Sequence, residues 1–155
     1  MTYEFLVDTY ATERIKVVSV WSEFRDEDML VRPNATDARG RSVHEQMVHQ
    51  CVSEDLWFRN MLGIDIGAPP LPKHETRTEF IRQYVNDSGK RLASLHSKDE
   101  DWWEADAQFF DVRRITSKEI GIGTVLLILL HLAHLSSRFA RLAGYINLPR
   151  HGLTG

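Results

Sequence analysis

The chain has 155 residues, of which 43% are hydrophobic and 26% are charged, and these values are typical of one soluble globular domain. Its 19 basic and 22 acidic residues leave a formal net charge of −3, which gives no reason to expect a nucleic-acid partner or a polybasic membrane anchor. The single cysteine, Cys51, cannot form a disulfide within these residues. We therefore expect residues 1–155 to form a single domain in the reducing cytoplasm.

Neither the beginning of the chain nor its most apolar stretch predicts a targeting signal or a membrane-spanning helix. Residues 1–8 lack a basic region followed by an apolar run and a small-residue cleavage site, so we expect no targeting signal. The longest apolar stretch, residues 124–135, contains two histidines and is shorter than the roughly 20 residues that a membrane-spanning helix needs. We expect a core helix there instead.

Two helices are predicted in the first half of the chain. Apolar residues recur at three- and four-residue steps over residues 3–24, which predicts the first helix. Ser42 and Glu45 then form a capping box, in which each side chain binds a backbone N–H left free at a helix start. The second helix is therefore predicted to run from Ser42 to Leu62 and to end at Gly63.

Two further helices are predicted in the second half. An apolar stripe predicts a helix over residues 78–95, and a second capping box opens a helix over residues 116–142. The connections are long, because residues 63–75 contain three prolines that exclude a continuous helix. Residues 97–115 contain four aromatic residues and are expected to form a packed loop, briefly extended at 110–115. This order predicts an all-α four-helix bundle with long connecting loops.

Seven histidines are the unusual count in this composition. His74, His96 and His151 fall in loops or at helix ends and are expected to be solvated surface residues. His131 and His134 are three residues apart on the apolar fourth helix, which places their Cβ atoms about 5–6 Å apart on one face. They are either two core histidines with hydrogen-bond partners, or ligands that hold a metal with a third group from another helix.

Two more histidines lie on the second helix, where the angle of about 100° between successive residues separates them. His44 lies in the apolar stripe that includes Met47 and Cys51, whereas His49 lies toward another side with Val52. Apolar periodicity therefore favours His44 as the more buried of the two.

The order of these features resembles the DinB-like superfamily of four-helix bundles. The resemblance covers most of the chain and rests on the acidic turn, the start of the second helix, its histidine with an aromatic pair, and the capped last helix, which lie at residues 25–30, 40–43, 49–58 and 116–135. In this superfamily one histidine of the second helix and two of the last helix commonly bind nickel or zinc. The resemblance thus implies a divalent metal held by His49, His131 and His134.

The last helix departs from the superfamily pattern at the third ligand. That pattern has two histidines four residues apart, followed by Arg-Gly-Gln, whereas here Leu135 stands four residues beyond His131 and Ser-Ser-Arg follows it. Leucine cannot bind a metal. Either His134 serves as the third ligand at three-residue spacing, or the pocket is metal-free, and the sequence leaves both open.

Three imidazoles would leave an open coordination position for water or substrate. The resemblance implies a metal-dependent enzyme that acts on a small molecule, either by hydrolysis or by transfer of a small thiol. The alternative is a non-catalytic, metal-free stress or interaction protein with the same bundle. Proteins of this superfamily often form homodimers, and either alternative is compatible with one.

Other residues complete the candidate pocket. Glu54 or Glu45 could serve as a general base, although a helix glutamate is more often solvated. Cys51 is expected to be a small core residue rather than a nucleophile. Arg138 could meet an anionic substrate or stay on a solvated face. Four aromatic residues either wall the pocket or pack in the core, namely Trp57, Phe58, Trp102 and Trp103.

Overall fold

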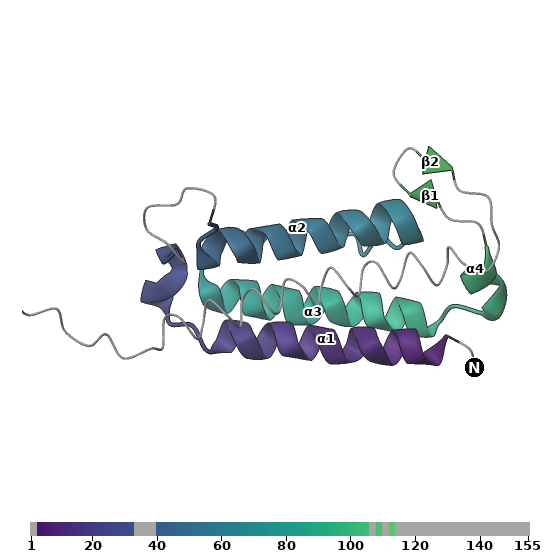
Figure 1. Ribbon diagram of the computed structural model, residues 1–155, viewed down its shortest axis with the longest axis horizontal. Coiled ribbons are helices and arrows are strands. Elements are labelled where there is room, and N and C mark those ends of the chain that lie inside the picture. The colour runs from purple at the N-terminus through teal and green to yellow at the C-terminus, as the bar shows by residue number, and fades with distance from the viewer. Residues whose placement is uncertain (1–2, 33–39, 106–107, 110–111, 114–155) are drawn as a thin grey trace, which may run out of the picture.

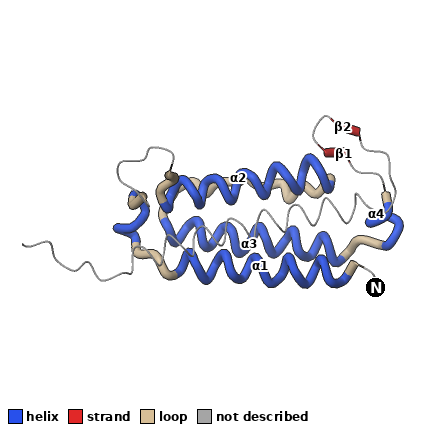
Figure 2. Tube along the Cα trace, viewed as in Figure 1, coloured by secondary structure: helices blue, strands red, loops and turns tan. Residues whose placement is uncertain are grey.

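The computed structural model describes residues 3–32, 40–105, 108–109 and 112–113. Three long helices lie side by side in this part of the chain; one short element lies between the first two, and three more follow the third (Figure 1). The long helices are α1 (Glu4–Ser22), α2 (Val43–Leu62) and α3 (Arg77–His96). Apart from two short strands, the described elements are helical, which confirms the all-α class (Figure 2).

The start and end of α2 are set by local interactions that the sequence predicted. The Ser42 side chain accepts a hydrogen bond from the Glu45 backbone N–H at 3.2 Å, and the Glu45 carboxylate accepts one from the Ser42 N–H at 2.7 Å. At the other end Gly63 has a φ of +62°, a left-handed conformation that costs glycine little. The prediction of a capped second helix ending at Gly63 is confirmed.

The predicted bounds of the other two long helices are also confirmed within two residues. The helix α3 begins after Thr76, whose side chain accepts a hydrogen bond from the Glu79 backbone N–H at 3.3 Å. The helix α1 packs closely against α3 along the bundle, and its buried face includes Tyr10, Val17 and Trp21.

Four short elements lie in the stretches that the sequence assigned to connections. They are the 3₁₀-helix η1 (Asp26–Leu30), the helix α4 (Glu100–Glu104) and the antiparallel strands β1 (Gln108–Phe109) and β2 (Val112–Arg113). The helix α4 forms because the Asp99 side chain accepts a hydrogen bond from the Trp102 backbone N–H at 2.9 Å. The brief extended stretch predicted at 110–115 is seen at Val112–Arg113.

The core of the described bundle has two apolar clusters. One lies toward the N-terminal end of α1 and includes Tyr10, Phe58, Leu95 and Trp103. The other includes Trp21, Met47, Cys51, Phe80 and Tyr84. Burying a large apolar side chain contributes about 1.5–3 kcal/mol, so these clusters supply much of the favourable free energy of the bundle.

Several predictions concern residues that the structure does not describe. The predicted fourth helix, with His131, His134, Leu135 and Arg138, lies outside the described residues, as does His151. None of the described helices combines the length and the apolar character that crossing a bilayer requires.

Candidate functional site

One face of α2 carries the histidine that the sequence singled out as a metal ligand. His49 is half-buried and lines a shallow surface depression of about 360 Å³ near the start of this helix. The other described lining residues come from the same helix and the segment before it, namely Arg41, His44, Glu45, Val48 and Val52. His49 therefore lies on a face of α2 different from the one that carries the buried Met47 and Cys51.

The orientation of the His49 ring is fixed in part by its own helix. Ser53 Oγ lies 3.2 Å from His49 Nδ1, one turn farther along α2. If Nδ1 carries the proton and donates it to Ser53, the lone pair is on Nε2, the atom that would then ligate a metal. This contact resembles the outer hydrogen bonds that orient histidine ligands in metal sites.

His44 has protein partners that explain its position. Its Nε2 lies 2.5 Å from a carboxylate oxygen of Glu75, in the segment before α3. Its ring also packs at a steep angle against Phe80, with 5.7 Å between ring centroids. Like His49 it is half-buried, so the apolar stripe did not separate the two as predicted. The exposed positions of His74 and His96 confirm their assignment to the surface.

The described residues alone do not supply a complete metal site. No group of three histidine, cysteine, aspartate or glutamate side chains in the described ranges is arranged to hold an ion. A metal at His49 would thus need ligands from outside these ranges, and the sequence offers His131 and His134.

Glu54 is not the solvated helix glutamate that the sequence favoured. Its side chain is fully buried in the middle of the bundle. Its carboxylate accepts hydrogen bonds from the hydroxyls of Tyr10 at 2.6 Å and Tyr84 at 2.9 Å, and from the Gln50 amide at 3.1 Å. These donors come from all three long helices, so a single carboxylate ties α1, α2 and α3 together.

Arg91 of α3 neutralises this buried charge. Its guanidinium lies 3.3 Å from Glu54 and 3.2 Å from Asp55, and all three side chains are at most 3% exposed. Asp55 also pairs with the more exposed Arg59 at 2.7 Å. We call Tyr10, Gln50, Glu54, Asp55, Tyr84 and Arg91 the buried polar network.

The network controls the protonation of its own members. Burial raises the pKa of both Tyr10 and Tyr84 well above 10.0, and the negative charge of Glu54 adds to this effect. Burial works against the charge on Arg91, but the surrounding negative charges, of which Glu54 acts most strongly, outweigh it and the pKa of Arg91 is raised. Both tyrosines are therefore neutral donors and Arg91 is a cation at neutral pH.

The arrangement suits a structural clamp better than a general base. A general base must reach a substrate proton directly or through one water, whereas the Glu54 side chain is sealed in the core. The signal for this burial is present in the sequence. Cys51, Glu54, Asp55 and Phe58 follow the steps of three and four residues that place side chains on one helix face.

The remaining residues of the predicted pocket have structural roles in the described part. Burial raises the pKa of the Cys51 thiol, which confirms it as a protonated core residue. Glu45 serves the capping box and pairs with Arg32, and the hydrogen bond from the Ser42 N–H is the main reason that its pKa is lowered. Trp57 packs against the first apolar cluster and is not among the residues that line the His49 depression.

Comparisons with known proteins do not assign the chain. No protein-family model matches it, and neither the comparison with curated proteins nor the comparison with solved structures gave a match. The class that the described part defines is an all-α helical bundle.

Proposed function

We propose that this chain is a DinB-like four-helix bundle that binds a divalent metal, nickel or zinc, through His49, His131 and His134. In this proposal it acts on a small molecule, by hydrolysis or by transfer of a small thiol. The observation that carries the proposal is the position of His49 in an open depression on α2, away from the buried polar network.

The apolar surroundings of His49 support a role for the fourth predicted helix. Val48 and Val52 beside it are half-buried, and Leu56 farther along α2 is 40% exposed. This face of α2 would gain stability from an apolar covering helix. The predicted helix over residues 116–142 is apolar around its two histidines, so it matches this face in character.

The chemistry in this proposal is divided between the metal and the protein. A bound nickel or zinc ion would act as a Lewis acid with one open coordination position. His49 would ligate through Nε2 while Ser53 holds its ring. Glu54 takes no part in proton transfer, because its carboxylate is committed to the buried polar network.

Elemental analysis of protein purified without an affinity tag tests the proposal. We expect about one nickel or zinc ion per chain, and little in the His49→Ala and His131→Ala variants. His74→Ala is the matched control, because His74 is exposed and should leave the metal content unchanged. Negligible metal in the wild-type protein, or equal metal in all four proteins, would contradict the proposal.

A metal-free bundle with a stress or interaction role is the second candidate. The sequence favours it at one position, where Leu135 stands at the usual place of the last ligand. Negligible metal in the wild-type protein would favour this second candidate. A His134→Ala variant added to the same analysis tests the third ligand, because it lowers the metal content only if the three-residue spacing is used.

A further inference from the structure

A second cavity is lined by residues of α1, of α4 and of the end of α3. These residues lie at the end of the bundle where the chain begins, which is opposite the start of α2 (Figure 1). It has a volume of about 280 Å³, close to the lower limit of typical small-molecule sites. The start of α1, the end of α3 and the start of α4 enclose it. The start of α1 and the junction of α3 with α4, which are distant in sequence, thus form one concave site, which does not depend on the proposed metal centre.

The floor of the cavity is apolar and aromatic. Val7, Leu95 and Trp103 line it, and each is at most 4% exposed. The Trp103 ring is stacked on Tyr3, with ring centroids 5.3 Å apart and planes within 8°. Because the Tyr3 hydroxyl also donates a hydrogen bond to Glu104 at 3.3 Å, the floor is held in place by α4. A preformed apolar floor of this kind favours a flat or compact apolar group.

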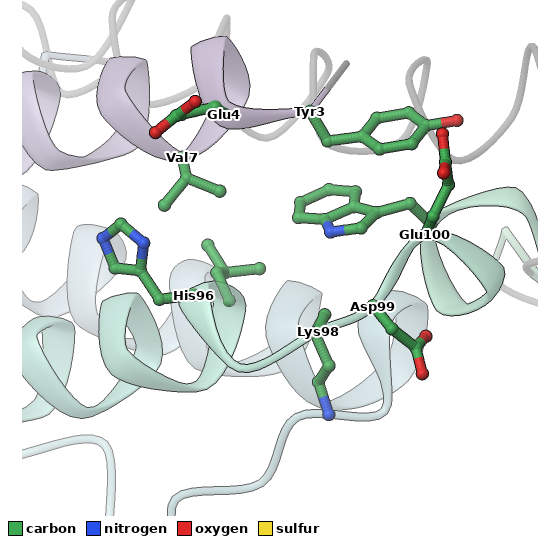
Figure 3. Close-up of a pocket in the computed structure, with 9 residues that line it drawn as sticks. Tyr3, Glu4, Val7, His96, Lys98, Asp99 and Glu100 are labelled. Carbon is green, nitrogen blue, oxygen red and sulfur yellow. The ribbon is translucent and has the colours of Figure 1, made fainter. Parts of the chain in front are cut away.

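The rim of the cavity is mainly negative. Glu4, Asp99 and Glu100 contribute three carboxylates, against the single ammonium of Lys98. Figure 3 shows Glu4 and Val7 of α1 across the opening from His96, with Lys98, Asp99 and Glu100 along the α3–α4 side. The Lys98 ammonium lies 5.2 Å from the centroid of the Trp102 ring, so the side chain has a partner outside the cavity.

We propose that this cavity binds a small organic monocation, an amine with a compact apolar or aromatic body. The apolar body would lie on Val7, Leu95 and Trp103, and the ammonium would face the negative rim, where Glu4 and Glu100 lie at opposite ends of the opening (Figure 3). An anion of the same shape would meet three like charges at the rim, which disfavours it. The cavity identifies the site, and the charges at its rim select the class of ligand.

The affinity should be modest because the ligand is small. A ligand of about ten non-hydrogen atoms in a half-open site corresponds to a Kd of about 0.1–1 mM. The carboxylates of Glu4 and Glu100 are solvent-exposed, so removing either charge should weaken binding by about three- to tenfold. Removing the Lys98 charge should tighten binding by a similar factor.

Titration of the full chain with 2-phenylethylamine tests this inference, followed by the NMR signal of the Trp103 indole N–H and by calorimetry. We expect saturable binding that shifts this signal, is weakened in Glu4→Gln and is strengthened in Lys98→Gln. Glu23→Gln is the matched control, because Glu23 is an exposed glutamate at the other end of α1. Circular dichroism of each variant verifies that it is folded.

Three results would overturn the inference. The first is 3-phenylpropionate, an anion of similar shape, binding as tightly as the amine. The second is amine binding that leaves the Trp103 signal unchanged, or that weakens equally in Glu4→Gln and Glu23→Gln. The third is no binding of the amine at millimolar concentration. Because the metal content of the protein plays no part in this titration, its outcome is independent of the test of the proposed function.

Discussion

Replacing Arg91 by methionine removes the cation of the buried polar network and should strongly destabilise the bundle. Methionine is unbranched and about as long as the aliphatic stem of arginine, so it can replace the packing of the buried Arg91 stem. What it cannot keep is the pairing with Glu54 and Asp55 at 3.3 and 3.2 Å. The change therefore removes the guanidinium and its ion pairs while it keeps most of the apolar stem.

The size of the stability loss in Arg91→Met depends on which charged groups lose their partner. Asp55 keeps Arg59 at 2.7 Å, so most of the loss falls on Glu54, which retains only neutral donors. Breaking a buried ion pair by removing one partner typically costs about 3–5 kcal/mol. For a chain of this size each kcal/mol lowers Tm by about 2–4 °C, so Arg91→Met should lower Tm by roughly 6–20 °C.

Urea denaturation followed by far-ultraviolet circular dichroism measures this loss, and the chain offers a matched control on the same helix. Arg82 and Glu79 of α3 form an ion pair in which the Arg82 side chain is 73% exposed. Arg82→Met should cost no more than about 1 kcal/mol, because exposed pairs contribute little. The loss in free energy of unfolding of the double variant Glu54→Gln/Arg91→Met should be smaller than the sum of the losses of its two single variants, by about 0.5–3 kcal/mol.

Two results would refute this reasoning. Equal losses in Arg91→Met and Arg82→Met would mean that the buried pair contributes no more than a surface pair. Strict additivity of Glu54→Gln and Arg91→Met would mean that the two side chains do not interact in the folded protein.

Three further predictions follow from the same structure. Because the pKa of Tyr10 is raised well above 10.0 in the folded state, the unfolded chain loses this proton first, and the free energy of unfolding should fall as pH rises above about 10. Urea denaturation at several alkaline pH values should show a shallower fall in Tyr10→Phe. Ser42→Ala should cost about 1 kcal/mol by removing the cap of α2, and unchanged stability in denaturation would contradict the capping role. Cys51 should resist alkylation in the folded protein and react once it is unfolded, since burial raises the pKa of its thiol; fast labelling of the native protein, detected by mass, would contradict this.

The parts of the fold that depend on local interactions could be predicted from the sequence. The cap at Ser42 and Glu45 and the termination at Gly63 involve residues close in the chain, so their sequence pattern is sufficient. The helix α4 was missed because five residues are too few for apolar periodicity, and its signal is only the capping Asp99.

The buried polar network could be predicted only in part. The spacing of Glu54 and Asp55 relative to Cys51 and Phe58 places both carboxylates on the core face of α2. Their partner Arg91 is 36 residues beyond Asp55 and on another helix, so it is set by the relative positions of α2 and α3. Helix periodicity gives each helix its inner face but not the residue that it meets on its neighbour.

In the candidate site, too, helix periodicity predicts the face on which a residue lies but not its partner. The position of His49 away from the main apolar stripe of α2 agrees with the prediction from the angle of about 100° between successive residues of a helix. The pairing of His44 with Glu75 depends on the segment before α3, whose path has no periodic pattern. Its partner is therefore a property of the folded chain.

The most direct test of the central claim is an experimental structure of the nickel- or zinc-soaked protein that gives the distances between the ring nitrogens of His49, His131 and His134. The proposal predicts that one nitrogen of each ring lies within about 3–4 Å of the other two, which fits metal–nitrogen bonds of about 2.0–2.1 Å. A structure in which His49 remains on α2 out of reach of both other histidines would contradict it.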